Sequence, residues 1–565
     1  MRGRHFYTDG LVVFLLALWF LFWGLAAIPY PGIQQDEALF TSAIYEPKTT
    51  ANTVQVFGRP VSLMLMSYLG TLKAWIYVPV LRFWDPSAYS LRVPVLLLGA
   101  ITIFFFYILL RRIADRATAL AGSALLATDG TYLYTSCFDW GPVVLQHLLS
   151  VTGVLALVQF HRTGRQRWLA GGFFLFGLAL WDKALFGWAL IGMGAAALCV
   201  FPRIILKYFR FNYLLIASVC FAIGAFPLLR YNVRSKGATL RASQGWSTDR
   251  QMILGKFTIL QRSFEGAGLN GYISVEDPSP QARAPRTQLE KLAADLDNRT
   301  GRRRASLMWY AFLGAILLLP WVWGTKARAP LLFSFIVCAL MWLQMLFGVG
   351  VGGSVHHVAL LWPWPQLLVA AALTGITSRL KGAGIPVLAV AVFLLCTRNF
   401  LSSNAFYSQL ARNGGATVWS DAIYELCEYL PATGAKQYLL LDWGMTDNLR
   451  FLSRGKMPLA WAADPILGDQ FHEQKQQEFR GFLDTENAVF VSHTAGYEVF
   501  AEVNRRRDQA LAELGYRRQI LRVISDSHGR PVFEVFRAAA GHQPSAAATT
   551  ATSPGARAGV SPNPL

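Results

Sequence analysis

The stretch PGIQQDEALFTSAIYEPKTT, residues 31–50, follows a long apolar run and holds Asp36 and Glu37 side by side. The apolar run, Leu11–Tyr30, is long enough to cross a bilayer as a helix. It has no small-residue cleavage site and is too long for the core of a signal peptide, so we expect a retained membrane span. Acidic residues are scarce, with 33 Asp and Glu among 565 residues. An acidic pair where a span leaves the membrane therefore indicates a function at the membrane rim.

The composition indicates a polytopic α-helical membrane protein. Hydrophobic residues make up 54% of the chain. Several apolar runs reach the roughly 20 residues that a spanning helix needs, and they must be helical because lipid offers the backbone no hydrogen-bond partner. On this length criterion we expect about eleven spans, at residues 11–30, 91–110, 117–136, 141–160, 168–182, 184–201, 212–230, 306–324, 330–348, 357–377 and 384–401.

The segment 61–81, VSLMLMSYLGTLKAWIYVPVL, is apolar but contains Gly70, Lys73 and Pro79. We expect a helix that lies in the membrane interface instead of a span. The lysines and arginines near span ends favour one side, which we assign as cytoplasmic. This topology places loops 31–90 and 231–305, the turns at 137–141, 182–183 and 349–356, and everything after about residue 402 on the extracytoplasmic side. The cluster Arg302–Arg304 disagrees with it.

The C-terminal region alternates helix-like and strand-like segments, which is typical of a small α/β domain. Helices are expected at 419–430, 474–483 and 497–514, and strands at 437–441, 488–492, 519–524 and 531–536. The predicted organisation is a transmembrane domain at 1–401 with outer loops 31–90 and 231–305, an extracytoplasmic α/β domain at 402–540, and a disordered low-complexity tail at 541–565.

Acidic residues recur at the outer rim of this topology: Asp36 with Glu37, Asp139 in CFDWGP, and Asp182 beside Lys183 in LALWDKAL. A carboxylate there can act as a general base on an acceptor hydroxyl or amine. A nearby cation can hold the phosphate of a leaving group and stabilise its developing charge.

The candidates for the cationic role are Lys183, Arg59 and Arg92. A site in the interface would let a lipid donor enter sideways from the bilayer while a polar acceptor arrives from water.

The ordered series of motifs resembles the C-type integral membrane glycosyltransferases, in particular the branch of protein O-mannosyltransferases and aminoarabinose–lipid A transferases. The resemblance covers roughly residues 10–400. It rests on QQDEALF after the first span, GRPVSLML, the Arg-x-Pro entry into the second span, the acid in CFDWGP, and the lysine-containing turn WDKAL. The sequence departs from the pattern at Arg59-Pro60-Val61, where a second proline is common, and in the FDWGP context of Asp139.

The resemblance implies transfer of a hexosyl or pentosyl group, with inversion, from a polyprenyl-phosphate donor. The acceptor would be a protein, a lipid or a polysaccharide. By this mapping Asp36 is the catalytic base or a carboxylate that orients the acceptor. Glu37 supports it, Asp139 completes the acidic site, and Lys183 lies near the lipid phosphate. It also implies an integral protein of the bacterial inner or plasma membrane, in contact with membrane lipids, with its site facing outward.

Cofactors and other partners are less defined by the sequence. Some members of the wider superfamily need a divalent metal between carboxylates and phosphate and others do not, so the metal stays unknown. No nucleic-acid-binding motif is present, and no nucleic-acid partner is expected.

Simpler readings of the same residues stay open. Asp36 and Glu37 can be a helix cap or a solvated loop, and Asp139 can cap the fourth span. Asp182 and Lys183 can form a neutralising ion pair.

Other simple readings and functional classes also stay open. His356 and His357 can contact the lipid phosphate, or they can be interfacial anchors together with Trp362 and Trp364. A lipid or sugar transporter or flippase is the main functional alternative, although its binding charges would lie near mid-membrane. A membrane scaffold or sensor is a third class.

Overall fold

The computed structural model describes residues 2–242, 245–301, 305–468 and 471–540. The tail at 541–565 that we expect to be disordered and the cluster Arg302–Arg304 lie outside the described residues. Two compact units are present. The helical unit comprises the chain up to Cys427 together with Gly444–Met457 and Asp526–Arg530. The α/β unit comprises Glu428–Trp443, Pro458–Ser525 and the chain from Pro531 onward.

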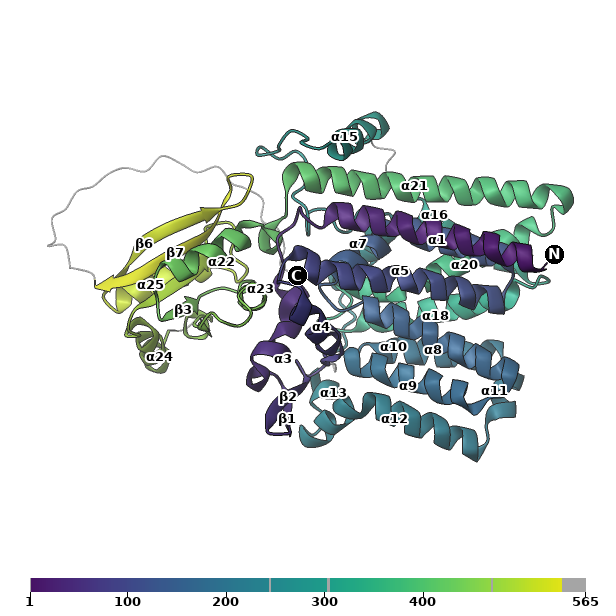
Figure 1. Cartoon of the computed structure of the whole chain (residues 1–565), viewed down its shortest axis with the longest axis horizontal. Helices are drawn as coiled ribbons and strands as arrows, with labels where there is room; N and C mark the ends of the chain where they lie inside the picture. Colours follow the sequence, from purple (N-terminus) through teal and green to yellow (C-terminus); the bar gives the residue numbers. More distant parts are fainter. Residues whose placement is uncertain (1, 243–244, 302–304, 469–470, 541–565) are drawn as a thin grey trace. The chain divides into compact units, whose positions relative to one another are not determined.

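Long apolar helices run side by side in the helical unit (Figure 1). By length and composition, 6 of the described helices can cross a membrane, or up to 8 if each of two bent pairs is one span. The chain is therefore a mostly helical integral membrane protein. The six are α1 (Arg2–Ala27), α5 (Ala88–Ile113), α8 (Val144–Thr163), α12 (Phe211–Arg234), α18 (Arg328–Phe347) and α21 (Gly384–Asn413). The bent pairs are α10 (Phe186–Val200) with α11 (Pro202–Tyr208), at 104°, and α19 (Val355–Val358) and η4 (Ala359–Leu361) with α20 (Trp364–Thr377), at 45°.

Other expected spans are shorter or broken helices, so the count of about eleven stays a prediction. The run 117–136 forms two helices, α6 (Arg116–Thr128) and α7 (Gly130–Phe138). They separate at Asp129, which has extended backbone angles and accepts a hydrogen bond from Tyr132 N at 2.9 Å, as an N-cap does. The remaining short helices are α9 (Gln166–Asp182), α16 (Met308–Leu317) and α17 (Leu319–Val322).

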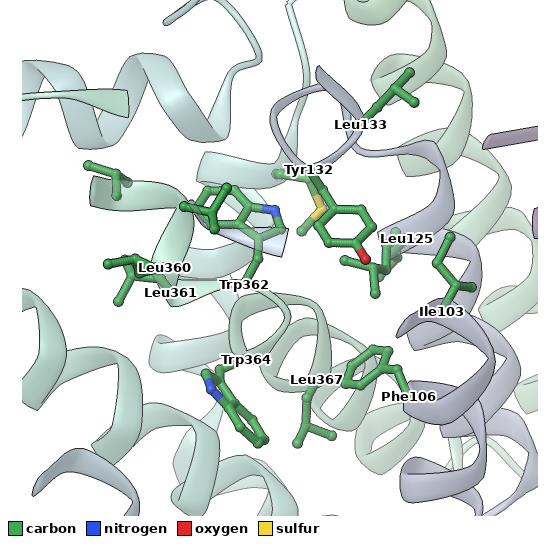
Figure 2. Close-up of a cluster of buried hydrophobic side chains, with 14 of the residues drawn as sticks. Ile103, Phe106, Leu125, Tyr132, Leu133, Leu360, Leu361, Trp362, Trp364 and Leu367 are labelled. Carbon is green, nitrogen blue, oxygen red and sulfur yellow. The ribbon is translucent and has the colours of Figure 1, made fainter. Parts of the chain in front are cut away.

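The core of the helical unit contains large aromatic and aliphatic side chains from α5, α6, α7, η4 and α20. Figure 2 shows them meeting around Trp362 and Tyr132, with Phe106, Leu125 and Leu367 beside them. The main-chain carbonyl of Ala359 in η4 lies 2.7 Å from Nε2 of His147 on α8. The core thus fixes η4, which directly follows the short helix α19.

The loop 31–90 is ordered at one end of the helices, opposite the N-terminus (Figure 1). It contains α2 (Gln35–Ala38), α3 (Ser42–Tyr45), the hairpin of β1 (Asn52–Val56) with β2 (Arg59–Met64), and α4 (Leu72–Phe83).

The prediction of an interfacial helix at 61–81 is wrong for the first half of this segment. Val61 to Met64 belong to strand β2, because Phe57 and Gly58 both have positive φ and form a tight hairpin turn. The helix begins only at Leu72.

Loop 231–305 contains α13 (Ala238–Ala242), α14 (Arg250–Phe264) and α15 (Gln288–Thr300). Beyond α21 the chain forms α22 (Ala422–Ala432), and later α23 (Thr446–Leu452) within the segment that belongs to the helical unit. The α/β unit has a five-stranded sheet in the order β4-β3-β5-β7-β6. Strands β4, β3 and β5 are parallel, whereas β7 is antiparallel to β5 and β6.

The strands of the sheet are β3 (Gln437–Leu440), β4 (Leu459–Trp461), β5 (Ala488–His493), β6 (Tyr516–Ser525) and β7 (Pro531–Ala540), and its helices include α24 (Glu473–Leu483) and α25 (Val503–Glu513). The four strands expected from the sequence match β3, β5, β6 and β7. The helix expected at 497–514 begins only at Val503, because Glu502 is left-handed, with φ 60°.

Candidate active site

The acidic pair lies on α2, a single helical turn whose N-cap is Gln34. The side-chain oxygen of Gln34 accepts from the backbone N of Asp36 at 2.6 Å and of Glu37 at 3.3 Å. The carboxylate of Glu37 accepts a hydrogen bond from Gln34 N at 3.0 Å, which completes a capping box. The cap of this helix is therefore Gln34, Glu37 is its capping-box partner, and Asp36 is left half-buried with its carboxylate outside the box.

Glu37 forms a buried ion pair with Arg92 of α5. The guanidinium Nε and one terminal nitrogen bind the two carboxylate oxygens at 2.9 and 2.8 Å. The terminal nitrogens also donate to the carbonyls of Ile28, Pro31 and Gly32. All five guanidinium N–H groups are then used. In this arrangement Arg92 holds the end of the first span and offers no donor to a phosphate.

Asp139 is also engaged within the protein. It has a left-handed backbone at the end of α7, and its Oδ1 accepts from the amides of Val143 and Val144 at 2.8 and 3.1 Å. Its other oxygen lies 2.9 Å from Nζ of Lys73, and both side chains are buried. The helix-cap reading is thus correct for Asp139.

Lys73 is a site residue that the sequence reasoning missed. Its charge looked like an interruption of an apolar segment, yet its Nζ donates to the carbonyls of Asp139 at 3.2 Å and Glu37 at 3.4 Å. It joins helix α4 to both acidic motifs. A lone lysine inside an interfacial helix was the available signal.

Lys183 is buried at the end of α9 and has no carboxylate partner among the described residues. Its Nζ donates to the carbonyl of Gly141 at 2.6 Å. Asp182 accepts from Gln146 at 2.7 Å instead, so the ion pair between Asp182 and Lys183 that the sequence allows is not formed. Lys183 keeps a buried positive charge with donors to spare.

Asp36 is the acid of this group that forms no ion pair in the described part of the chain. Its one side-chain contact is a long hydrogen bond from Gln34, at 3.5 Å. Burial raises the pKa of Asp36 to about 6, although the charges of Lys183 and Lys73 act in the opposite direction. The structure therefore brings Asp36, Lys183, Lys73 and Asp139 together, with Asp36 the acid that forms no ion pair among the described residues.

Arg59 is the predicted site residue that the structure does not bring to this group. It is exposed in the hairpin and follows the turn residues Phe57 and Gly58. In the described structure, Arg59 forms no hydrogen bond or ion pair with the acids or with Lys183.

The two histidines are partly exposed on α19. Trp362 and Trp364 are 1% exposed and belong to the core in Figure 2. The reading of all four residues as an interfacial belt is therefore wrong for the tryptophans.

A late segment of the chain completes the surroundings of α2. The side-chain oxygen of Gln35 accepts from the amides of Gly444 and Thr446 at 3.1 and 3.0 Å. Asn448 of α23 donates to the carbonyl of Ile33 at 3.0 Å. All these residues belong to the helical unit.

Asp447 lies on α23 and is buried. It pairs with Arg450, which also binds Glu46 at 3.0 Å. Burial raises the pKa of Asp447 to about 7, and the charge of Asp36 contributes to the increase. No spacing along the chain marks Asp447, because Asp36 and Glu46, whose charges also act on it, precede it by about 400 positions.

The described residues do not fit a metal centre. No group of three or more His, Cys, Asp or Glu side chains in the described ranges has a metal-binding arrangement. The reason is visible in the hydrogen bonds: Glu37 is occupied by Arg92, and Asp139 by Lys73 and two amides.

The fold resembles that of ArnT from Cupriavidus metallidurans bound to undecaprenyl phosphate, with TM-score 0.54 and 13% identity over 93% of this chain and 98% of that chain. The apo state of the same ArnT gives TM-score 0.53 and 13% identity, over 94% and 98% of the two chains.

An oligosaccharyltransferase from Archaeoglobus fulgidus in the apo form gives TM-score 0.49 and 14% identity, over 95% and 75% of the two chains. No protein-family model and no curated protein matches the sequence. The likeness to the two ArnT structures shows the fold.

Proposed function

We propose that this protein is a glycosyltransferase that moves a sugar from a polyprenyl-phosphate donor to an extracytoplasmic acceptor. The observation that carries the proposal is a half-buried carboxylate without an ion pair, Asp36, in the electrostatic field of the buried, carboxylate-free Lys183. The solved ArnT with the same fold is bound to undecaprenyl phosphate, which supports a lipid-phosphate donor.

The reaction requires one proton acceptor and one phosphate-binding cation. The ionised Asp36 takes the proton of the acceptor hydroxyl or amine while the acceptor atom forms a bond to the anomeric carbon. The bond from that carbon to the phosphate oxygen breaks, and its electron pair stays on the departing polyprenyl phosphate. Lys183 stabilises the charge that develops there. Attack opposite the leaving group inverts the anomeric centre.

The other predicted site residues take revised roles in this proposal. Glu37 and Arg92 position the α2 loop, and Asp139 positions Lys73 beside it. Arg59 stays a candidate for phosphate binding only if the hairpin moves toward the site. The transferred group is a hexose or pentose, and the acceptor a protein, a lipid or a polysaccharide.

We further propose about eleven spans in a bacterial plasma membrane, with the site and a C-terminal domain beginning near residue 402 on the extracytoplasmic side. The positively charged connections support this orientation.

The test is donor turnover by the purified full-length protein in lipid nanodiscs. A panel of polyprenyl-phosphate sugars is supplied, and release of polyprenyl phosphate with transfer to membrane acceptors is measured. Turnover of at least one donor establishes the transferase. Movement of labelled lipid across the bilayer without cleavage of any donor would show a flippase instead.

The activity should depend on pH through Asp36. Because its pKa is raised to about 6 and the base must be ionised, kcat/KM for the donor should rise between pH 5 and pH 7. Below pH 6 the rate should fall about tenfold for each pH unit. A profile that is flat across this range in the wild type contradicts the assignment of Asp36 as the base.

Lys183→Gln should weaken donor binding. A hydrogen bond to a charged group contributes about 1.5–3 kcal/mol, so the KM for the donor should rise roughly 10- to 100-fold. Lys48→Gln removes an exposed cation of loop 31–90 and is the matched control, and Arg59→Gln tests the hairpin in the same assay. An unchanged KM in Lys183→Gln would remove Lys183 from the phosphate site.

A further inference from the structure

The neighbouring histidines His356 and His357 and the buried Lys183 lie close to one glycine, Gly141. A Cβ atom added to Gly141 would lie 2.2 Å from Cδ2 and 2.8 Å from Nε2 of His356, so the edge of this imidazole packs directly on the glycine. The carbonyl of Gly141 accepts the hydrogen bond from Lys183. His356 and His357 have ring centroids 4.2 Å apart. The two imidazoles and the ammonium of Lys183 therefore gather at one place.

The hydrogen bonds at Nδ1 determine where the histidine protons are. The backbone amide of Gly352 lies 3.2 Å from Nδ1 of His357. An amide N–H can only donate, so this Nδ1 is an acceptor and the neutral ring carries its proton on Nε2. The hydroxyl of Ser354 lies 2.8 Å from Nδ1 of His356, and donation by this hydroxyl gives the same tautomer.

Nε2 of His357 is a donor, and Nε2 of His356 is a donor in the tautomer in which Ser354 donates to Nδ1. Neither Nε2 atom has a hydrogen-bond acceptor within the described ranges of the chain, where the only hydrogen bonds of the two imidazoles are those at Nδ1. Both rings are partly exposed. These two imidazoles, beside an ammonium that has no carboxylate partner in the described structure, form an arrangement that an anion would complete.

The charges around the imidazoles also favour an anion. The positive charges of Lys183 and Lys256 act on His357, and that of Lys183 acts on His356. None of the groups that act on the two rings is a carboxylate, whereas Asp36, Asp139 and Asp182 all act on Lys183. Lys183 thus interacts electrostatically both with the acids and with the two imidazoles.

The loop that carries the histidines is held in place by a second buried lysine. Nζ of Lys256, on α14, donates to the carbonyls of Met345 at 2.9 Å, Leu346 at 3.3 Å and Gly348 at 2.5 Å. These carbonyls are at the end of α18, where a cation is favoured by the helix dipole. The contact anchors the glycine-rich loop whose Gly352 orients His357.

We propose that Nε2 of His356 and of His357 bind, together with Lys183, the phosphate of the lipid-linked donor. The inference rests on the proposed function and adds two phosphate ligands to it. When the bond between the anomeric carbon and the phosphate oxygen breaks, the electron pair moves onto the phosphate. Donors already aimed at this group then become stronger hydrogen-bond partners without rearrangement.

The test uses paired substitutions of each histidine in the full-length protein in nanodiscs. Asparagine keeps an acceptor near the position of Nδ1 but loses the donor at Nε2, whereas glutamine can place an amide donor near Nε2. Binding of a short-chain polyprenyl phosphate is titrated, with the uncharged polyprenol as the ligand that lacks phosphate. Each asparagine variant should lose roughly tenfold in affinity for the phosphate form, as expected for one hydrogen bond to a charged group.

The glutamine variants should retain most of the affinity, and no variant should change the binding of polyprenol. Equal affinity in the wild type and both asparagine variants would overturn the inference. Inorganic phosphate binding as tightly as the lipid would also overturn it, because the site would then serve free phosphate.

Donor cleavage, measured in parallel for the wild type and for Asp36→Asn, separates this inference from the proposed function. A wild type that binds polyprenyl phosphate through the histidines but cleaves no donor would support the phosphate site and reject the transferase. A wild type that does not bind polyprenyl phosphate would reject both.

Discussion

Asp36→Asn should reduce donor turnover roughly 10²- to 10⁴-fold, the usual contribution of a general base. The substitution removes the charge but little of the packing, because the Asp36 carboxylate has only the long hydrogen bond from Gln34. The protein should therefore fold normally and bind the donor with nearly unchanged affinity. The measurement is kcat and KM for donor cleavage, together with the melting temperature in detergent.

Asp85→Asn is the matched control for this substitution. Asp85 is an acid of the same loop 31–90, is highly exposed and pairs with Arg454. Its substitution should leave both kcat and KM unchanged. Equal losses of turnover in the two variants would mean that the loop tolerates no change of charge. The result would then not support Asp36 as the general base. Full turnover in Asp36→Asn would exclude it as the base.

Arg92→Met should give the largest loss of stability of any substitution in the site. It leaves Glu37 buried without its partner and leaves three main-chain carbonyls without donors. Removing one member of a buried pair costs about 3–5 kcal/mol. We expect low yield and a strongly lowered melting temperature, measured by the loss of monodisperse protein on heating.

The double variant Glu37→Gln with Arg92→Met should recover part of this loss, because the stranded charge is removed. Arg59→Met is the control, since Arg59 is exposed in the hairpin. If Arg92→Met melts like the wild type, the ion pair does not hold the end of the first span.

The acidic motifs could be predicted as a group because each follows or ends a membrane span. Asp36, Asp139 and Lys183 are all near turns at one end of the helices, and a topology from charge bias alone brings such turns together. The roles within the group could not be predicted. Whether a carboxylate is free or engaged depends on partners such as Lys73, which comes from a segment with its own ambiguous pattern.

The boundaries of the apolar segments were less predictable. A hydropathy pattern cannot distinguish a continuous span from two helices that separate at one capping residue, as happens at Asp129. It also cannot distinguish interfacial tryptophans from core tryptophans. Trp362 packs on Phe264 of α14 and Trp364 on Phe333 of α18, and both tryptophans belong to the core of the helical unit.

The hydrogen bonds of Gln35 have a consequence for the synthesis of this protein on the ribosome. Gln35 is made early, but its partners Gly444 and Thr446 follow 409 and 411 residues later. At about 5–20 residues per second, roughly 20–80 seconds pass before they can bind. During this time the α2 turn lacks the segment that fixes it. The turn that carries the proposed base Asp36 therefore stays without these hydrogen bonds until the segment around residue 446 has been made.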